Sequence, residues 1–244
     1  MKSFSFILFS VLIYNIAEAQ LLGQISEKRY KQSQILDPVY GIKLYEKLNP
    51  VLDGDSLRND KRGYACQGWV EDKYENGQTL HKGYYTDGQL KVYKNYYENG
   101  QLERSFKAVG VVGSSMQIFY IDGKLKSEVD YHKNTPQKWS DYYPNGQLAY
   151  YEENQKNMEY VIQRKSYFEN GKPESIFEMI DPKKKRYIKT EYYENGNVKE
   201  TGEMKFNSSA IDYQKDGNWK TYDENGKLIS EDIYVNGELN KNGN

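Results

Sequence analysis

The chain has 244 residues, of which 34 are basic and 35 acidic, so its formal net charge is −1. This balance provides no overall field to attract nucleic acid or an anionic membrane surface. The single cysteine, Cys66, excludes an internal disulfide. Charged residues make up 28% of the chain, but its 25 tyrosines predict a folded β protein. Disordered chains are poor in aromatic residues, whereas tyrosine suits a half-buried strand.

Residues 1–19 have the pattern of a secretory signal peptide. Lys2 supplies the positive charge, Phe4–Ile16 form the apolar stretch, and a small-x-small motif ends at Ala19. The alternative is a membrane anchor, but the apolar stretch is shorter than the roughly 20 residues that span a bilayer. We therefore expect cleavage between Ala19 and Gln20, no stable membrane insertion afterwards, and a periplasmic or secreted protein.

Residues 20–63 lack the repeat that fills the rest of the chain. Pro38 and Pro50 bound any helix in this segment, so it is expected to be a short helix or an extended stretch. An array of strands leaves open edges that invite pairing with other chains. We expect residues 20–63 to form an N-terminal cap over the first strands.

A periodic turn dominates the chain from residue 64 onward. A major-turn glycine recurs from Gly77 to Gly196 at spacings of 23, 23, 23, 25 and 25 residues, and further breaks, such as the one at Gly88, fall about midway between these glycines. The resulting half-period of about 11 residues leaves strands of about eight, too short for a crossover helix, which predicts an antiparallel meander. The predicted turn glycines are Gly77, Gly88, Gly100, Gly123, Gly146, Gly171, Gly196, Gly226 and Gly237.

The turn itself reads as Asn-Gly between aromatic and aliphatic residues, as in "NYYENGQL". Asn-Gly favours a two-residue type I′ hairpin loop, which places Tyr97 opposite Leu102. A bulge or a different loop is expected near Gly226, because Tyr222 comes one residue early. The same rule predicts the pairs Tyr120–Leu125, Tyr143–Leu148, Phe168–Pro173 and Tyr193–Val198.

A second aromatic residue precedes each paired one and must point to the opposite face of the sheet. These residues are Tyr96, Phe119, Tyr142, Tyr167 and Tyr192. They predict an aromatic ladder along the array. The ladder either stabilises a thin sheet or forms a binding surface for a protein partner or for sugars.

The repeated Tyr-x-Asn-Gly-x-Leu pattern, together with "DGNWKTYDENGKLISEDIYVNGEL" at residues 216–239, resembles the MORN-repeat variant family, including proteins described as YwqK-type antitoxins. The resemblance covers residues 64–239 and leaves 240–244 as a tail. It implies an all-β fold: an elongated, single-layer antiparallel meander of hairpin repeats, twisted or curled, that acts as a scaffold and not as an enzyme. With a signal peptide, an antitoxin-like member would fit an immunity protein that meets a toxin in the periplasm.

No sequence motif for catalysis, metal binding or cofactor binding is present: HExxH, CxxC, GxSxG and the Walker loop are all missing. We predict no catalytic, metal-binding or cofactor-binding residue. His81 is expected to be a solvated strand residue and Cys66 a half-buried one. The glutamates before the turns are expected to be solvated, and so are Lys183–Arg186, for which contact with anionic lipid or polysaccharide is the alternative.

Together these patterns predict an exported, non-catalytic repeat scaffold that binds a protein partner, such as a toxin, through a sheet face or edge. The alternative is a glycan or cell-wall binding module that uses the aromatic ladder. Wall-binding repeats are usually rich in Trp, whereas this chain has three Trp residues at uneven spacing. Neither nucleic acid nor a cofactor is expected as a ligand.

Overall fold

The computed structural model describes residues 28–30 and 44–240. The predicted signal peptide and its cleavage site therefore lie outside the described residues. The chain divides into two compact units, each of which combines two segments: residues 1–70 with 83–91, and residues 71–82 with 92–244. No helix among the described residues is long and apolar enough to cross a membrane.

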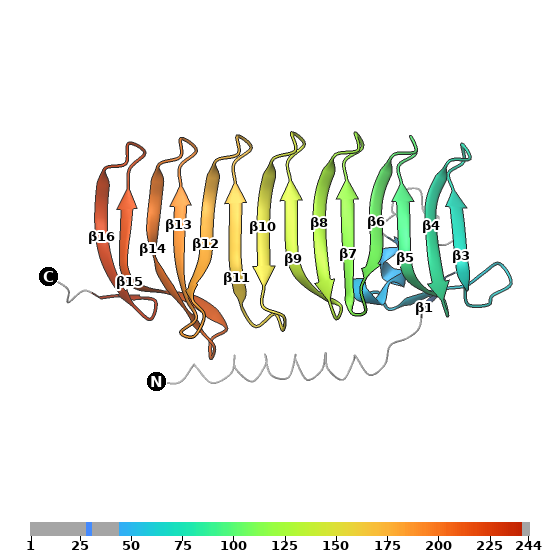
Figure 1. The fold of residues 1–244 in the computed structure, drawn as a ribbon, viewed down its shortest axis with the longest axis horizontal. Coiled ribbons are helices and arrows are strands. Elements are labelled where there is room, and N and C mark those ends of the chain that lie inside the picture. The colour runs from blue at the N-terminus through green and yellow to red at the C-terminus, as the bar shows by residue number, and fades with distance from the viewer. Residues whose placement is uncertain (1–27, 31–43, 241–244) are drawn as a thin grey trace, which may run out of the picture. The chain divides into compact units, whose positions relative to one another are not determined.

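The repeat region forms one open sheet in which the strands follow one another in chain order from β3 to β17 (Figure 1). Neighbouring strands whose register is defined pair antiparallel, for example β6 with β7 and β13 with β14. From β6 onward the strands pack mainly against their two sequence neighbours, which confirms the predicted single-layer meander. The strands are β3 (Gly68–Lys73), β4 (Thr79–Thr86), β5 (Gln89–Tyr96), β6 (Leu102–Val109), β7 (Gly113–Phe119), β8 (Leu125–His132), β9 (Thr135–Tyr142), β10 (Leu148–Asn154), β11 (Val161–Tyr167), β12 (Pro173–Asp181), β13 (Arg186–Tyr192), β14 (Val198–Asn207), β15 (Asp212–Tyr222), β16 (Leu228–Val235) and β17 (Glu238–Leu239).

The major turns lie along one edge of the sheet, at the top of Figure 1. They are three-residue loops, so the predicted two-residue loops are wrong. The N–H of Gly100 donates to the carbonyl of Tyr97 at 2.9 Å, and the N–H of Tyr97 donates to the carbonyl of Gln101 at 2.8 Å. Gly100 has a φ of 83°, which is the left-handed position after a type I turn. Asn99 is favoured here because its Oδ1 accepts the N–H of Gln101 at 3.0 Å.

The third loop residue shifts the predicted register by one position. Tyr96, and not Tyr97, lies opposite Leu102, and Asn95 lies opposite Arg104, which leaves Glu103 as a bulge. The predicted pairings of Tyr97, Tyr120, Tyr143, Phe168 and Tyr193 are therefore wrong. The observed pairs are Phe119–Leu125, Tyr142–Leu148, Tyr167–Pro173, Tyr192–Val198 and Tyr222–Leu228, each followed by the same irregularity.

The last major turn has the same loop and the same bulge as the others, so the departure from the repeat that was expected near Gly226 does not occur. The N–H of Asp223 donates to the carbonyl of Lys227 at 2.9 Å, and the N–H of Gly226 donates to that of Asp223 at 2.9 Å. Asp223 thus occupies the position that an aromatic residue holds in the other major turns. Tyr222 falls into the ordinary register.

The tyrosines at the start of the major turns, which do not pair as predicted, connect successive hairpins. Each hydroxyl donates to the carbonyl of the residue that ends the first strand of the next hairpin. The five bonds are Tyr74 to Tyr96 at 2.6 Å, Tyr97 to Phe119 at 2.8 Å, Tyr120 to Tyr142 at 2.7 Å, Tyr143 to Tyr167 at 2.7 Å and Tyr193 to Tyr222 at 2.9 Å. Phe168 holds the same turn position but has no hydroxyl. The turn residues therefore join repeats as well as reversing the chain.

Two-residue loops with positive φ at both residues occur on the opposite edge. Asp87 and Gly88 have φ values of 50° and 79°, and Asn236 and Gly237 have 51° and 89°. Positive φ at both central residues is the type I′ geometry that brings flanking strands into a tight hairpin. The loop predicted for the major turns thus occurs in some of the minor ones, while others, such as that between β10 and β11, are longer.

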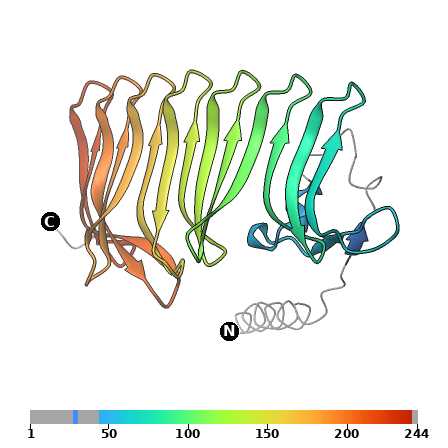
Figure 2. The same ribbon diagram turned by 45° about the vertical axis from the view of Figure 1, so that its right-hand side comes forward.

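One face of the larger unit, which we call the core face, carries its buried aromatic residues. Phe177 stacks on Tyr187 with ring centroids 4.6 Å apart, and Tyr213 meets both rings edge-on. The ends of β14 and β15 bend toward β11 (Figure 2). There the N–H of Val161 donates to the Tyr213 hydroxyl at 2.6 Å, and the Tyr187 hydroxyl donates to the carbonyl of Val161 at 2.9 Å. These bonds close the core over β11–β13.

The smaller unit contains the described part of the predicted cap. It is built from β1 (Lys28–Tyr30), β2 (Ser56–Arg58) and two 3₁₀ turns, η1 (Glu46–Leu48) and η2 (Pro50–Leu52). Arg58 is buried, and its Nη1 donates to the Tyr85 hydroxyl at 3.1 Å. Its N–H donates to the carbonyl of Gly88 at 2.9 Å. A Cβ at Gly88 would lie 2.9 Å from the Arg58 carbonyl oxygen, so only glycine allows this approach.

Candidate functional site

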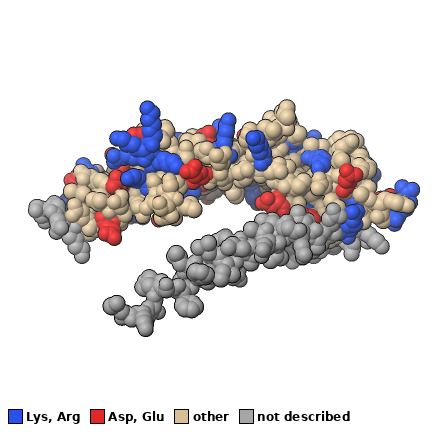
Figure 3. All heavy atoms as spheres, turned by 90° about the horizontal axis from the view of Figure 1, so that it is seen from below, with Lys and Arg blue, Asp and Glu red and all other residues tan. Residues whose placement is uncertain are grey.

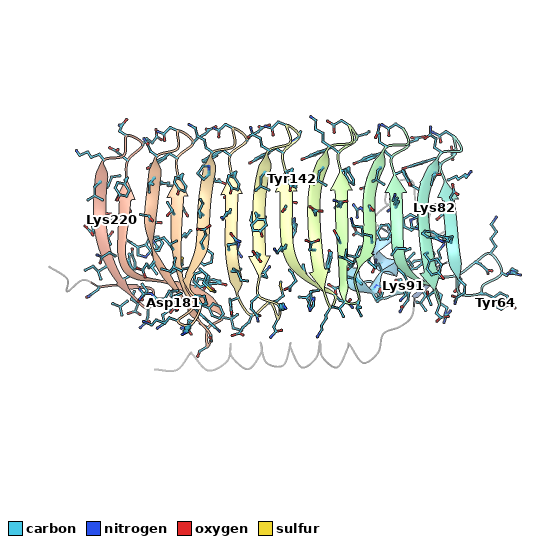
Figure 4. The ribbon with its side chains drawn as sticks, in the orientation of Figure 1. Tyr64, Lys82, Lys91, Tyr142, Asp181 and Lys220 are labelled. Carbon is cyan, nitrogen blue, oxygen red and sulfur yellow. The ribbon has the colours of Figure 1, made fainter. Side chains whose placement is uncertain are left out.

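The predicted aromatic ladder lies on the face opposite the core face, close to the major turns. Because Asn95 is on the core face with Tyr93, alternation places Tyr96 on the other face. Tyr142 holds the equivalent position next to its turn (Figure 4). We call the set the aromatic stripe; it comprises Tyr96, Phe119, Tyr142, Tyr167 and Tyr192 with their partners Leu102, Leu125, Leu148, Pro173 and Val198.

The stripe is a continuous, partly open apolar surface. All ten side chains are half-buried. Equivalent aromatic residues are two strands apart, about 10 Å, so the five pairs extend over roughly 40 Å of sheet. An aliphatic side chain faces each ring across its hairpin. This arrangement can contact a partner without any chemical reaction.

Polar residues border the stripe on the same face. Lys165 Nζ lies 2.5 Å from Glu178, and Lys138 Nζ lies 3.4 Å from Glu153. The bond from Glu178 raises the pKa of Lys165, and the bond from Gln163 lowers the pKa of Glu153. Both groups therefore stay charged near neutral pH. Figure 3, which looks onto the edge opposite the major turns, shows acidic and basic side chains interspersed there, with Lys and Arg gathered over the C-terminal strands.

The predicted turn glycines all occupy turns with positive φ, between 79° and 97°. The glutamates before the major turns are exposed, as expected. Lys185 and Arg186 are partnered rather than simply solvated, because Lys185 bonds Glu159 and Arg186 bonds Glu203.

His81 is not the solvated residue that the sequence suggested. It is fully buried, and its Nδ1 lies 2.6 Å from Asn95 Oδ1. The difference arises because His81 faces the same side as the core residue Tyr93, whose ring lies 6.0 Å away. Cys66 is buried, not half-buried. Among the described residues, no three His, Cys, Asp or Glu side chains gather in a way that could hold a metal ion.

Sequence reasoning missed a group of side chains on the core face, at the centre of the array. Trp139 lies opposite Glu152, which lies opposite Arg164, and Asp141 lies opposite Tyr150. We call these five residues the central cluster. Trp139 and Asp141, like Tyr150 and Glu152, are two positions apart and so share a face, but this signal is visible only once the strands are aligned.

Comparison with known proteins identifies the repeat. The model of the MORN repeat variant matches five segments: residues 91–106, 138–157, 161–181, 188–205 and 215–236. These segments cover most strands from β5 to β16. No curated protein matches the chain.

Solved structures give only distant likenesses. TarM is 16% identical with a TM-score of 0.18, over 59% of this chain and 22% of TarM. A TcdB2-TccC3-TEV structure is 8% identical with a TM-score of 0.19, over 72% of this chain and 13% of its own. A protein of unknown function from Bacteroides fragilis is 10% identical with a TM-score of 0.13, over 69% of this chain and 93% of its own.

TM-scores of this size do not indicate a shared fold, and this chain spans less than a quarter of TarM. The assignment rests on the five matched repeats and on the hairpin that recurs through them. The chain belongs to the MORN repeat variant family.

Proposed function

We propose that the protein is a non-catalytic scaffold that binds a protein partner through the aromatic stripe. The observation that carries the proposal is the alignment of ten half-buried aromatic and aliphatic side chains on one face of the sheet. Tyrosine is enriched at the centres of protein interfaces, where a polar rim surrounds it. The ion pairs bordering the stripe supply such a rim.

The dimensions support a protein partner. A standard interface uses about 20 to 30 residues on each side. The ten stripe residues would form its centre, and a length of roughly 40 Å matches an α-helix of about 27 residues or an extended segment of about 12 residues. Pairing each ring with an aliphatic residue favours a protein over a sugar, because sugar recognition needs polar groups beside the ring.

The proposal includes export and the class of the partner. The N-terminal signal pattern supports a periplasmic or secreted protein, and the family resemblance supports a toxin as the partner. In this form the protein acts as an immunity protein that occupies the toxin surface. No catalytic step is required of it.

The test is affinity capture from envelope extract, identification of the captured protein and titration with that protein after purification. Tyr142→Glu with Tyr167→Glu places two charges in the centre of the stripe and should weaken binding more than about tenfold. The matched control is Lys205→Glu, which changes the charge on the same face at the other end of β14 from the stripe residue Val198, where Lys205 lies opposite Gln214. It should change the affinity less than about threefold.

Circular dichroism and urea unfolding of each variant establish that the sheet is intact. A partner that binds the double variant and the wild-type chain equally would refute the stripe as the interface. If the purified capture product does not bind the wild-type chain at all, the scaffold proposal itself fails.

A further inference from the structure

We propose that the central cluster, on the opposite face from the stripe, is a binding site for a neutral sugar. The cluster comprises Trp139, Asp141, Tyr150, Glu152 and Arg164 from β9, β10 and β11. It is separate from the proposed protein interface and does not depend on it. The inference rests on an exposed indole held beside fixed hydrogen-bonding groups.

The aromatic part is an open platform between two buried regions. Trp139 is 45% exposed, whereas Val129 and Phe177, which lie in the same cross-strand row, are 6% and 7% exposed. Tyr150 meets the indole edge-on, with ring centroids 6.4 Å apart and planes at 82°. The array thus leaves one large ring uncovered in the middle of its core face.

The indole is held in place by its own polar atom. Trp139 Nε1 donates to Asp141 Oδ1 at 2.8 Å. The N–H is therefore satisfied within the protein, and the flat face of the ring remains for a ligand. A ring that is fixed before binding loses little conformational entropy when a ligand stacks on it.

A second set of bonds fixes the neighbouring carboxylate. Glu152 accepts from the Tyr150 hydroxyl at 2.6 Å, from Asn154 Nδ2 at 2.8 Å and from Arg164 Nε at 2.7 Å. Burial alone would raise the pKa of Glu152, but these three bonds hold it below its usual value. Burial and the bond to Glu152 raise the pKa of Tyr150 to about 12. The network is rigid and keeps its charges at neutral pH.

The charge of the cluster indicates an uncharged ligand. Arg164 balances Glu152, and the charge on Asp141 is shared with the indole N–H. No hydrogen bond to Asp141 Oδ2 occurs among the described residues, and the Arg164 guanidinium is held beside the ring by Glu152 and the Tyr150 hydroxyl. Acceptor and donor therefore flank the ring, and a ligand must both donate and accept.

A pyranose meets each of these requirements. It has an apolar face of C–H groups that stacks on an indole, and its hydroxyls both donate and accept hydrogen bonds. The central cluster measures about 10 Å across its three strands and about 7 Å along them, which suits one or two sugar rings. A cation could bind the carboxylates, but the positive charge of Arg164 beside them would repel it.

The experiment titrates the full chain with cello-, malto-, xylo- and chito-oligosaccharides, followed by tryptophan fluorescence and calorimetry. We expect one class to bind with a Kd of about 0.1 to 1 mM, the range for a shallow site with one stacking ring. Trp139→Ala should weaken binding more than about tenfold, and Arg164→Lys about threefold or more because the planar donor is lost.

Trp69→Ala is the matched control, because Trp69 is 62% exposed and packs edge-on against a tyrosine, Tyr84. It should leave the affinity unchanged. If Trp139→Ala does not fold, Asp141→Asn serves as the second variant and should also weaken binding.

Three results would overturn the proposal: no binding of any sugar class up to about 20 mM, equal binding by the wild-type chain and Trp139→Ala, or binding of tetramethylammonium in place of sugars. Because the stripe lies on the other face, Trp139→Ala should still bind the captured protein partner. Failure of this site is therefore distinguishable from failure of the scaffold proposal.

Discussion

The hydroxyl of Tyr120 provides the sharpest test of how neighbouring repeats are joined. The ladder between β8 and β9 ends at the pair Ser127–Asp141, one residue short of Tyr142. The Tyr120 hydroxyl donates to the carbonyl of Tyr142 at 2.7 Å. This carbonyl lies just beyond the β8–β9 ladder, so the hydroxyl supplies the hydrogen bond that the ladder does not. Tyr120→Phe removes this bond and changes nothing else in the covalent structure of the ring.

The expected cost follows from the surroundings of the bond. A net intramolecular hydrogen bond contributes about 0.5 to 1.5 kcal/mol. Tyr120 is half-buried, so water can reach the freed carbonyl, and we expect a loss of about 1 kcal/mol in the free energy of unfolding. For a chain of this size the loss corresponds to about 2 to 4 °C in Tm.

Phe168 allows the reverse change. It occupies the same three-residue turn, since its N–H donates to the carbonyl of Lys172 at 2.9 Å and its carbonyl accepts from Gly171 at 2.8 Å. The ladder between β12 and β13 likewise ends one residue before Tyr192. Phe168→Tyr should therefore supply the missing donor to Tyr192 and raise stability by about 0.5 to 1 kcal/mol.

Urea unfolding, followed by circular dichroism, measures both changes against a matched control. Tyr142→Phe removes a hydroxyl for which no hydrogen bond occurs among the described residues, so its unfolding midpoint should stay near that of the wild type. Equal midpoints for Tyr120→Phe and Tyr142→Phe would refute the role of the hydroxyl. A Phe168→Tyr chain less stable than the wild type would refute the equivalence of the turns.

Three further changes test the packing and the charge of the core face. Gly202→Ala would place a Cβ 2.4 to 2.5 Å from the ring of Trp219, and should lower the free energy of unfolding by about 1 to 3 kcal/mol in urea titrations. Tyr213→Phe removes the acceptor of the Val161 N–H and should cost about 1 to 2 kcal/mol, with faster hydrogen exchange at that amide. Burial raises the pKa of Glu103 to about 7, so the unfolded state binds fewer protons between pH 4.5 and 7 and wild-type stability should fall as pH rises through that window. Glu103→Gln should flatten this slope in thermal melts, and an unchanged slope would contradict the assignment.

The order of the strands could be predicted because it depends on spacing alone. A half-period of about 11 residues leaves no room for a crossover, so successive strands had to pair antiparallel. The structure agrees over β5–β16. The described part of residues 20–63 could not be predicted in detail, because its two 3₁₀ turns carry no periodic signal.

The register could not be predicted from Asn-Gly alone. This dipeptide suits a type I′ loop through positive φ, and it equally suits a type I turn with a left-handed glycine. Here the deciding contact is Asn99 Oδ1 with the N–H of Gln101, and it is reinforced by the Tyr97 hydroxyl bond to the next hairpin. The second contact joins residues 22 positions apart, so no short stretch of sequence contains it.

The aromatic stripe could be predicted from the sequence, whereas the central cluster could not. Tyr142 of the stripe recurs with the turn, so its place on a common face follows from the repeat even though its partner was assigned one residue away. Trp139 and Arg164 do not recur, and they lie in one cross-strand row, on either side of Glu152, in the register that follows a bulge in β10. In a repeat array, features shared by every unit serve stability or an extended contact. A residue that departs from the repeat, and is left exposed by it, indicates a local and more specific function.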